Sequence, residues 1–134
     1  QKKERLIPSI IFKALKKERI FISNPNQIRD FIHIDEISNV IIKSLTLKRL
    51  NGKIINLGSG KGRKISEIAR LICEYLGYRN IKFNQRSEGN EKERISVADV
   101  SLARQLMGWK PKNYFSKDII KTIDTYIENQ DFIK

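Results

Sequence analysis

The sequence predicts a mixed α/β fold in a unit of one domain's size. Its 134 residues, of which 40% are hydrophobic and 8% aromatic, are enough to bury a core. Segments with apolar residues at helical spacing alternate with short runs rich in β-branched residues, and glycine, proline and asparagine mark the boundaries. This alternation indicates a few helices and short strands within one unit spanning residues 1–134.

The first half of the chain is expected to hold two helices and two strands. Pro8 suits the first turn of a helix, and a strand is expected at residues 19–23. A second β-rich run spans residues 28–34. Asp35 is placed to cap the next helix, which would continue to Leu45.

The middle of the chain predicts a strand, a glycine-rich loop and a helix. The strand is expected at residues 53–57 and the loop at residues 58–62. Ser66 would cap the helix, and Gly77 stands just past its expected end.

The last third predicts a short strand, a long polar segment and two helices. Residues 81–83 form the expected strand, and residues 84–94 are polar and without periodicity. Loops of this length in a compact domain often carry function. Asp99 and Ser116 are placed to cap the two final helices.

Charge and cysteine content narrow the classes of protein. The net charge of +12 indicates a polyanionic partner or phosphate-bearing ligands. The single cysteine, Cys73, excludes a disulfide framework and a cysteine-based zinc site, and it fits a reducing compartment. Since no long apolar run is present, we expect a cytoplasmic protein without a signal peptide, a membrane span or a membrane partner.

The glycine-rich stretch at residues 58–62 follows neither known phosphate-loop pattern. A dinucleotide fingerprint beginning at Gly58 would need glycine where Arg63 stands, and a P-loop would need serine or threonine directly after Lys61, where Gly62 stands. We therefore expect a structural turn here, with an anion bound at the following helix start as the alternative.

The lone histidine and its acidic neighbours are expected to be structural. His33 would lie on a strand between two isoleucines and be packed or half-exposed, and with no second histidine or cysteine nearby no metal site is expected. Asp30, Asp35 and Glu36 could suggest paired carboxylates. Helix capping and the helix dipole account for the last two sufficiently.

Three arginines are placed where binding groups usually lie. Arg29 opens an otherwise apolar strand, and Arg86 and Arg94 bracket the long polar segment. The planar guanidinium fork donates two parallel hydrogen bonds to phosphate oxygens, so the three suit a diphosphate. The alternative is that each arginine only solvates the surface.

Four segments together resemble one family. In chain order they are residues 5–8 (R-L-I-P), 27–36 (Q-I-R-D-F-I-H-I-D-E), 56–60 (N-L-G-S-G) and 98–111 (A-D-V-S-L-A-R-Q-L-M-G-W-K-P). They resemble the C-terminal part of the extended short-chain dehydrogenase/reductases, which are the NAD-dependent nucleotide-sugar epimerases and dehydratases. The resemblance covers nearly the whole chain and implies a mixed α/β C-terminal lobe that lacks the N-terminal Rossmann half.

The resemblance implies a substrate-binding lobe that grips the nucleoside diphosphate of a sugar nucleotide. Arg29 matches the family's arginine on the pyrophosphate, Arg86 matches an arginine of its loop segment, and Arg94 matches one that some members carry. Leu6 matches a position whose backbone approaches phosphate. The strand whose backbone borders the nucleobase matches Ile20, Phe21 and Ile22.

The chain also departs from the family pattern. Asn90 stands where the family usually has an aspartate for the ribose, and residues 23–26 replace a glycine-containing turn. Tyr78 and Lys82 have the bare spacing of the catalytic Tyr-x-x-x-Lys, but the tyrosine follows a helix-ending glycine and the lysine lies in an expected strand. No catalytic and no cofactor-binding residue is therefore expected in this chain.

The resemblance further implies a parent enzyme in which NAD is bound mainly by the missing N-terminal half. This chain alone is then expected to be inert and, with an apolar face uncovered, to form a homodimer or aggregate. Two alternatives remain. A basic nucleic-acid-binding module is disfavoured because the basic residues are spread over all segments. A non-catalytic interaction domain of the same fold shares every feature of the sequence.

Overall fold

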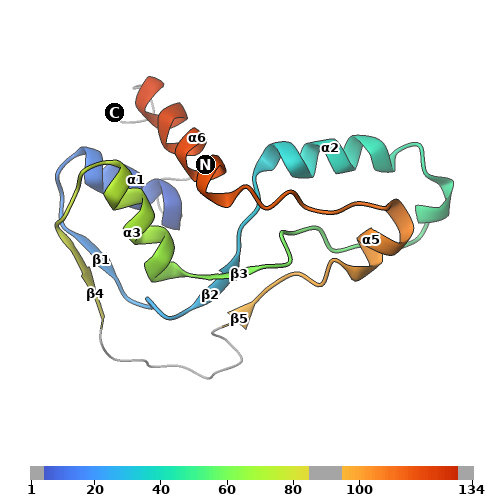
Figure 1. The fold of residues 1–134 in the computed structure, drawn as a ribbon, viewed down its shortest axis with the longest axis horizontal. Coiled ribbons are helices and arrows are strands. Elements are labelled where there is room, and N and C mark those ends of the chain that lie inside the picture. Colours follow the sequence, from blue (N-terminus) through green and yellow to red (C-terminus); the bar gives the residue numbers. More distant parts are fainter. Residues whose placement is uncertain (1–4, 85–94, 130–134) are drawn as a thin grey trace.

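The computed structural model describes residues 5–84 and 95–129 and shows a mixed α/β unit. Helices α1 and α3 lie beside one pair of strands, and α2 and α5 lie at the opposite end, with a second small sheet between (Figure 1). The helices are α1 (Leu6–Leu15), α2 (Ile34–Ser44), η1 (Lys48–Leu50, a 3₁₀ turn), α3 (Ile65–Tyr75), α5 (Ser101–Met107) and α6 (Phe115–Glu128). The strands are β1 (Ile20–Ile22), β2 (Ile28–Asp30), β3 (Gly62–Lys64), β4 (Ile81–Phe83) and β5 (Ile95–Ser96).

The strands form two small sheets. β1 pairs in parallel with β4, and Ile20 lies opposite Ile81. In the second sheet β2 is the central strand, antiparallel to β3 and parallel to β5. Arg29 of β2 therefore lies opposite Arg63 on one side and Ser96 on the other. The central strand of this sheet is the one that carries the predicted diphosphate arginine.

The main core is built where α1, α3 and α6 pack around β1. β1 alternates as a one-sided strand should, because Ile20 and Ile22 are buried whereas Phe21 is 56% exposed. The ring of Phe12 meets that of Tyr126 edge-on, at 5.3 Å between centroids. The buried members of the cluster are Ile10, Ile11, Ala14, Ile20, Ile22, Ile65, Ile68, Ala69, Ile72, Cys73, Phe115, Ile119 and Ile123.

Cys73 is part of this core. It lies on α3 and is 3% exposed. Burial raises the pKa of its thiol, because the low dielectric of the core disfavours the thiolate. Cys73 is therefore an apolar packing residue of α3 in the folded chain.

Two helices end in the same backbone motif with different residues at its key position. After α3, Gly77 has φ +62°, its N–H donates to Glu74 O, and the N–H of Tyr78 donates to Cys73 O. After α1, Lys17 has φ 57° and makes the equivalent bond. Both are Schellman endings, which require a left-handed residue. The prediction that Gly77 stands just past the end of α3 is confirmed.

The expected strand at residues 53–57 is wrong. Residues 53–57 are irregular, and the strand of this region, β3, lies after the glycine-rich stretch. Both edges of β2 are taken by β3 and β5, and residues 53–57 pair with no strand of either sheet in the described residues. A local β-rich sequence forms a strand only where it finds such a partner. Its first isoleucine, Ile54, is 91% exposed. The strands expected at 19–23 and 81–83 are confirmed as β1 and β4.

The second β-rich run is shorter than expected, and its end starts a helix. β2 stops at Asp30, and α2 begins at Ile34 with His33 as its N-cap. The Nδ1 atom of His33 accepts a hydrogen bond from the N–H of Asp35 at 3.2 Å. The expectations that His33 lies on a strand and that Asp35 caps this helix are therefore wrong, because the histidine ring nitrogen supplies the acceptor that the cap needs.

The other expected caps differ by one or two residues. α3 begins at Ile65, with the N–H of Lys64 donating to the carboxylate of Glu67, so Ser66 lies inside the helix. α6 begins at Phe115, so Ser116 is also inside its helix. Asp99 does accept a hydrogen bond from the N–H of Ser101, the first residue of α5, at 2.9 Å.

Helix α2 presents an uncovered apolar face. Val40 is 2% exposed and faces inward, whereas the side chains that follow one another along the outer face are open to solvent: Ile34, Ile41, Ile42 and Leu45. Within the described parts of the chain no helix combines the length and the apolar character that crossing a bilayer would need.

Candidate functional site

A cavity of about 310 Å³ lies between the start of α1, the end of β1 and β2. Its walls come from separate elements because β1 runs into the turn at residues 23–26, which returns the chain as β2. The lining residues are Leu6, Phe21, Ile22, Ser23, Asn24, Gln27, Arg29, Phe31 and Ile65. The cavity thus combines apolar side chains, polar amides and one guanidinium, the composition typical of a small-ligand site.

This cavity brings together four of the residues that the family resemblance implied for substrate binding: Leu6, Phe21, Ile22 and Arg29. Ile20 is 1% exposed and packs in the core, where its N–H donates to the carbonyl of Asn80. Ile20 therefore does not line this cavity. Arg86, Asn90 and Arg94 lie outside the described residues.

Arg29 stands at the junction of two cavities. Besides the first cavity it borders a second, of about 540 Å³, together with Asp30, Asn56, Gly58 and the residues that follow β5. Arg29 is half-buried, and its Nη1 donates to the carbonyl of Ile28 at 2.8 Å. Arg63, opposite it on β3, instead places its guanidinium 4.1 Å from the centre of the Phe115 ring.

Sequence reasoning missed the polar residues of the first cavity. Asn24 lies in the turn between β1 and β2 and Gln27 directly follows that turn, and the N–H of Gln27 donates to the carbonyl of Asn24 at 3.3 Å. From the sequence alone, Asn24 is interpreted only as part of a turn and Gln27 only as the first residue of the motif at residues 27–36. Their position at the end of a strand, next to an arginine on the following strand, is the signal that could have identified them.

The glycine-rich loop is occupied by an internal carboxylate. The N–H of Ser59 donates to Oδ1 of Asp30 at 2.8 Å, and those of Gly60 and Ala98 donate to its Oδ2 at 3.0 and 3.1 Å. The hydroxyl of Ser59 also donates to Oδ1. The expectation of a structural turn agrees with this geometry, and Asp30, interpreted only as one of several acidic residues, proves to be the group that organises it.

The same loop does not fit a dinucleotide. A phosphate-binding loop presents unpaired N–H groups directly before a helix. Here the N–H groups of Ser59 and Gly60 are used by Asp30, and β3 separates the loop from α3. The described residues thus offer no glycine loop that could receive the pyrophosphate of NAD.

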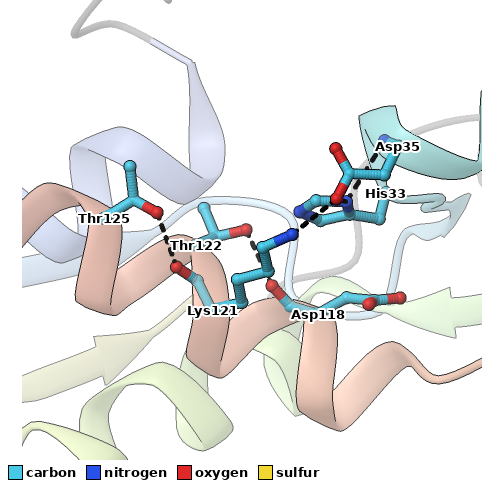
Figure 2. A network of polar contacts seen from close by, with 6 residues as sticks. All are labelled: His33, Asp35, Asp118, Lys121, Thr122 and Thr125. Atoms are coloured by element: carbon cyan, nitrogen blue, oxygen red, sulfur yellow. Dashed lines mark hydrogen bonds and ion pairs between the residues drawn. The ribbon is translucent and has the colours of Figure 1, made fainter. Parts of the chain in front are cut away.

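A polar network joins the start of α2 to α6 (Figure 2). Nζ of Lys121 pairs with Oδ2 of Asp35, and Nδ1 of His33 lies 3.4 Å from the same oxygen. The hydrogen bond from Lys121 is the main reason why the pKa of Asp35 lies below its ordinary value. The network borders a mainly apolar cavity of about 540 Å³ between the two elements.

This network links α2 to α6 and, among the described residues that form it, offers no free hydroxyl donor to a ligand. Thr122 and Thr125 donate their hydroxyls to carbonyls one turn earlier in α6, so neither is presented to a ligand as a donor. Among residues 5–84 and 95–129, no three histidine, cysteine, aspartate or glutamate side chains gather as metal ligands would.

The sequence of the chain is similar to those of known enzymes. No protein-family model matches the chain. It is 27% identical over 145 aligned residues to the dTDP-glucose 4,6-dehydratase of Xanthomonas campestris pv. campestris, an alignment that covers 98% of this chain and 40% of the relative. The chain therefore spans well under half the length of the relatives it matches.

Two solved structures share the fold. An epimerase of Methanothermobacter thermautotrophicus superimposes with a TM-score of 0.86 at 23% identity, covering 98% of this chain and 40% of that one. The Bordetella bronchiseptica enzyme WbmG, solved with NAD and UDP, gives a TM-score of 0.79 at 23% identity, covering 93% of this chain and 38% of that one.

The expected fold class is thus confirmed, since a mixed α/β unit of this topology matches the C-terminal part of such enzymes. The chain is similar in sequence to dTDP-glucose 4,6-dehydratases and UDP-sugar epimerases, and it has the fold of the C-terminal part of such enzymes.

Proposed function

We propose that this chain is the nucleotide-sugar-binding portion of an NAD-dependent sugar dehydratase or epimerase. The observation that carries the proposal is the cavity beside Arg29, in which Leu6, Phe21, Ile22 and Arg29 come together from α1, β1 and β2. Residues that far apart in sequence line one cavity only if the fold assembles it, and these are the positions that the family resemblance implied.

Four of the lining residues have chemistry that suits parts of a nucleoside diphosphate. Arg29 binds the diphosphate, because a guanidinium donates paired hydrogen bonds to phosphate oxygens. Phe21, exposed at the cavity edge, packs against the base, and the amides of Asn24 and Gln27 bind its polar edge. We extend the proposal to Arg86 and Arg94 as further diphosphate contacts and to Asn90 at the ribose.

The reaction itself belongs to the part of such an enzyme that binds NAD. The glycine loop of this chain is filled by Asp30, and the chain covers about 40% of the length of its relatives. In the proposed enzyme NAD supplies hydride exchange with the sugar. The role of this chain's residues is to bind and orient the nucleotide sugar, and the chain alone is inert.

The proposal is tested by calorimetric titration of the chain with UDP and with dTDP, beside uridine and inorganic phosphate. We expect a nucleoside diphosphate to bind and uridine to bind far less. Arg29→Ala should weaken nucleotide binding by about one to two orders of magnitude, the size of one charge-assisted bidentate contact.

Lys16→Ala is the matched control. Lys16 is an exposed cation at the end of α1 and does not line the cavity. Its removal should leave the affinity unchanged. Equal losses at Arg29 and Lys16, with a steep salt dependence, would instead identify a general polyanion binder such as a nucleic-acid module and would defeat the proposal.

A further inference from the structure

We propose that Asp30 is a positioning residue for Arg29. Its carboxylate holds in place the two segments that lie beside β2, namely the loop before β3 and the residues after β5. The inference rests on the proposed function, because it assigns to Asp30 the task of fixing the arginine that binds the diphosphate. Asp30 itself touches the glycine-rich loop and not the proposed ligand.

The carboxylate of Asp30 gathers donors from two distant segments. Ser59 and Gly60 belong to the loop before β3, and Ala98 follows β5. Each oxygen of the carboxylate accepts two of these hydrogen bonds, counting the hydroxyl of Ser59. Hydrogen bonds to an ionised group are the strong ones in proteins, so a single side chain organises this junction.

The junction is built so that a carboxylate can enter it. A Cβ on Gly58 would lie 2.7 Å from Oδ2 of Asp30 and 2.6 Å from Cβ of Ala98, distances that side chains do not occupy. An asparagine at position 30 would keep one acceptor and turn an NH₂ group toward backbone N–H donors. Glycine at 58 and a charged carboxylate at 30 therefore depend on one another.

The same contacts fix the register around Arg29. Arg29 lies opposite Arg63 of β3 and Ser96 of β5. The segments that Asp30 binds adjoin those two residues, at Gly60 before β3 and at Ala98 after β5. Since Asp30 is the next residue along β2, its carboxylate ties both neighbouring strands to the backbone that carries Arg29.

The test compares Asp30→Asn with Asp124→Asn in the full chain. Both substitutions remove one carboxylate charge, but Asp124 lies on α6 and accepts a hydrogen bond from the hydroxyl of Tyr75. The measurements are amide hydrogen exchange at residues 59, 60 and 98, the NMR signal of the Arg29 side-chain Nε–H, and UDP affinity.

For Asp30→Asn we expect faster exchange at all three amides, a shifted Arg29 Nε–H signal and a roughly tenfold loss of affinity, the effect of weakening one charge-assisted hydrogen bond. For Asp124→Asn we expect none of these. A folded Asp30→Asn variant with an unchanged Arg29 signal would overturn the inference, whatever the exchange rates show.

Two further outcomes keep the inference separate from the proposed function. If the unmodified chain does not bind UDP, the proposed function fails, and the Arg29 signal alone decides the role of Asp30. If Asp30→Asn does not fold, Ser59→Ala replaces it, since this variant removes only the hydroxyl donor to Oδ1. The Arg29 signal must then shift in Ser59→Ala, and an unchanged signal would overturn the inference.

Discussion

Asp35 shows how one exposed side chain links two helices through charge. Its carboxylate receives a hydrogen bond from Lys121 of α6 and lies beside the ring of His33. Lys121 therefore makes a specific ion pair, although no sequence pattern links positions 35 and 121. A contact across 86 residues is fixed only by the packing of α2 and α6.

This ion pair predicts a pH dependence. Lys121 lowers the pKa of Asp35 below the value of about 3.9 that aspartate has in an unfolded chain. The pair therefore contributes stability above that pH and loses it as the pH falls through the lower folded pKa. We expect Asp35→Asn to lower the melting temperature at pH 6 and to have a smaller effect at pH 2.

Thermal unfolding at the two pH values, in low salt, measures this effect. The shift should be small, because the pair is exposed, and it should shrink further in 0.5 M salt. Glu128→Gln, at the end of α6, the helix that carries Lys121, is the control and should show no such dependence. An equal effect of Asp35→Asn at both pH values would contradict the ion-pair explanation.

At the scale of elements, the ends of α1 and α3 make a matched pair. Both end in a Schellman motif, with Lys17 in the left-handed conformation after α1 and Gly77 after α3. A residue with a Cβ costs about 1 kcal/mol in that conformation. We expect Lys17→Gly to raise the free energy of unfolding by about 0.5 to 1 kcal/mol and Gly77→Ala to lower it by about 1 kcal/mol.

Urea denaturation of the two variants gives both values. A Cβ on Gly77 would meet nothing within 4 Å, so its expected cost is conformational and not steric. Lys16→Gly, one residue earlier in the helical part of the turn, is the control and should destabilise. Destabilisation by both glycine substitutions would show that helix propensity, and not the left-handed position, sets the energy.

Elements with a local signal could be predicted from the sequence, whereas those set by partners could not. β1 and β4 are short runs rich in isoleucine and phenylalanine, and α3 has helical spacing with a glycine just past its end. Residues 53–57 have a local character similar to β1 but pair with no strand of the two sheets that the structure describes. His33 caps α2 because of where its ring lies after β2 ends, which no spacing rule contains.

The candidate site divides in the same way. Arg29, Phe21, Ile22 and Leu6 could be named from motif residues, and the cavity brings them together. The hydrogen bonds of Asp30 to Ser59, Gly60 and Ala98 could not be predicted, since these partners lie 29, 30 and 68 residues away in the sequence. Tertiary hydrogen bonds of this kind leave no periodicity in a sequence.

At the scale of the whole molecule, the outer face of α2 predicts self-association. Ile34 is 66% and Leu45 81% exposed, and Ile41 and Ile42 lie between them on the same side of the helix. Contiguous apolar surface of this kind drives proteins together. We expect light scattering in 0.3 M salt, where the repulsion from the net charge of +12 is screened, to detect dimers or larger species at high concentration.

The double variant Ile42→Lys, Leu45→Lys should shift the chain toward monomer. Ile54→Lys is the matched control, because Ile54 is 91% exposed but lies outside α2, and it should leave the association unchanged. If the unsubstituted chain stays monomeric at high concentration, the exposed face of α2 does not drive self-association and the prediction is wrong.

The buried thiol of Cys73 can report how often the core around α3 opens. A disulfide reagent reacts with the thiolate, and in the folded chain that form is both disfavoured and inaccessible, so labelling requires the core around α3 to open. Ile65, at the start of the same helix, lines the cavity beside Arg29. The rate of labelling at one natural cysteine therefore reports how often α3 separates from α1 and α6, and a ligand that occupies the cavity should slow that rate without any probe being introduced.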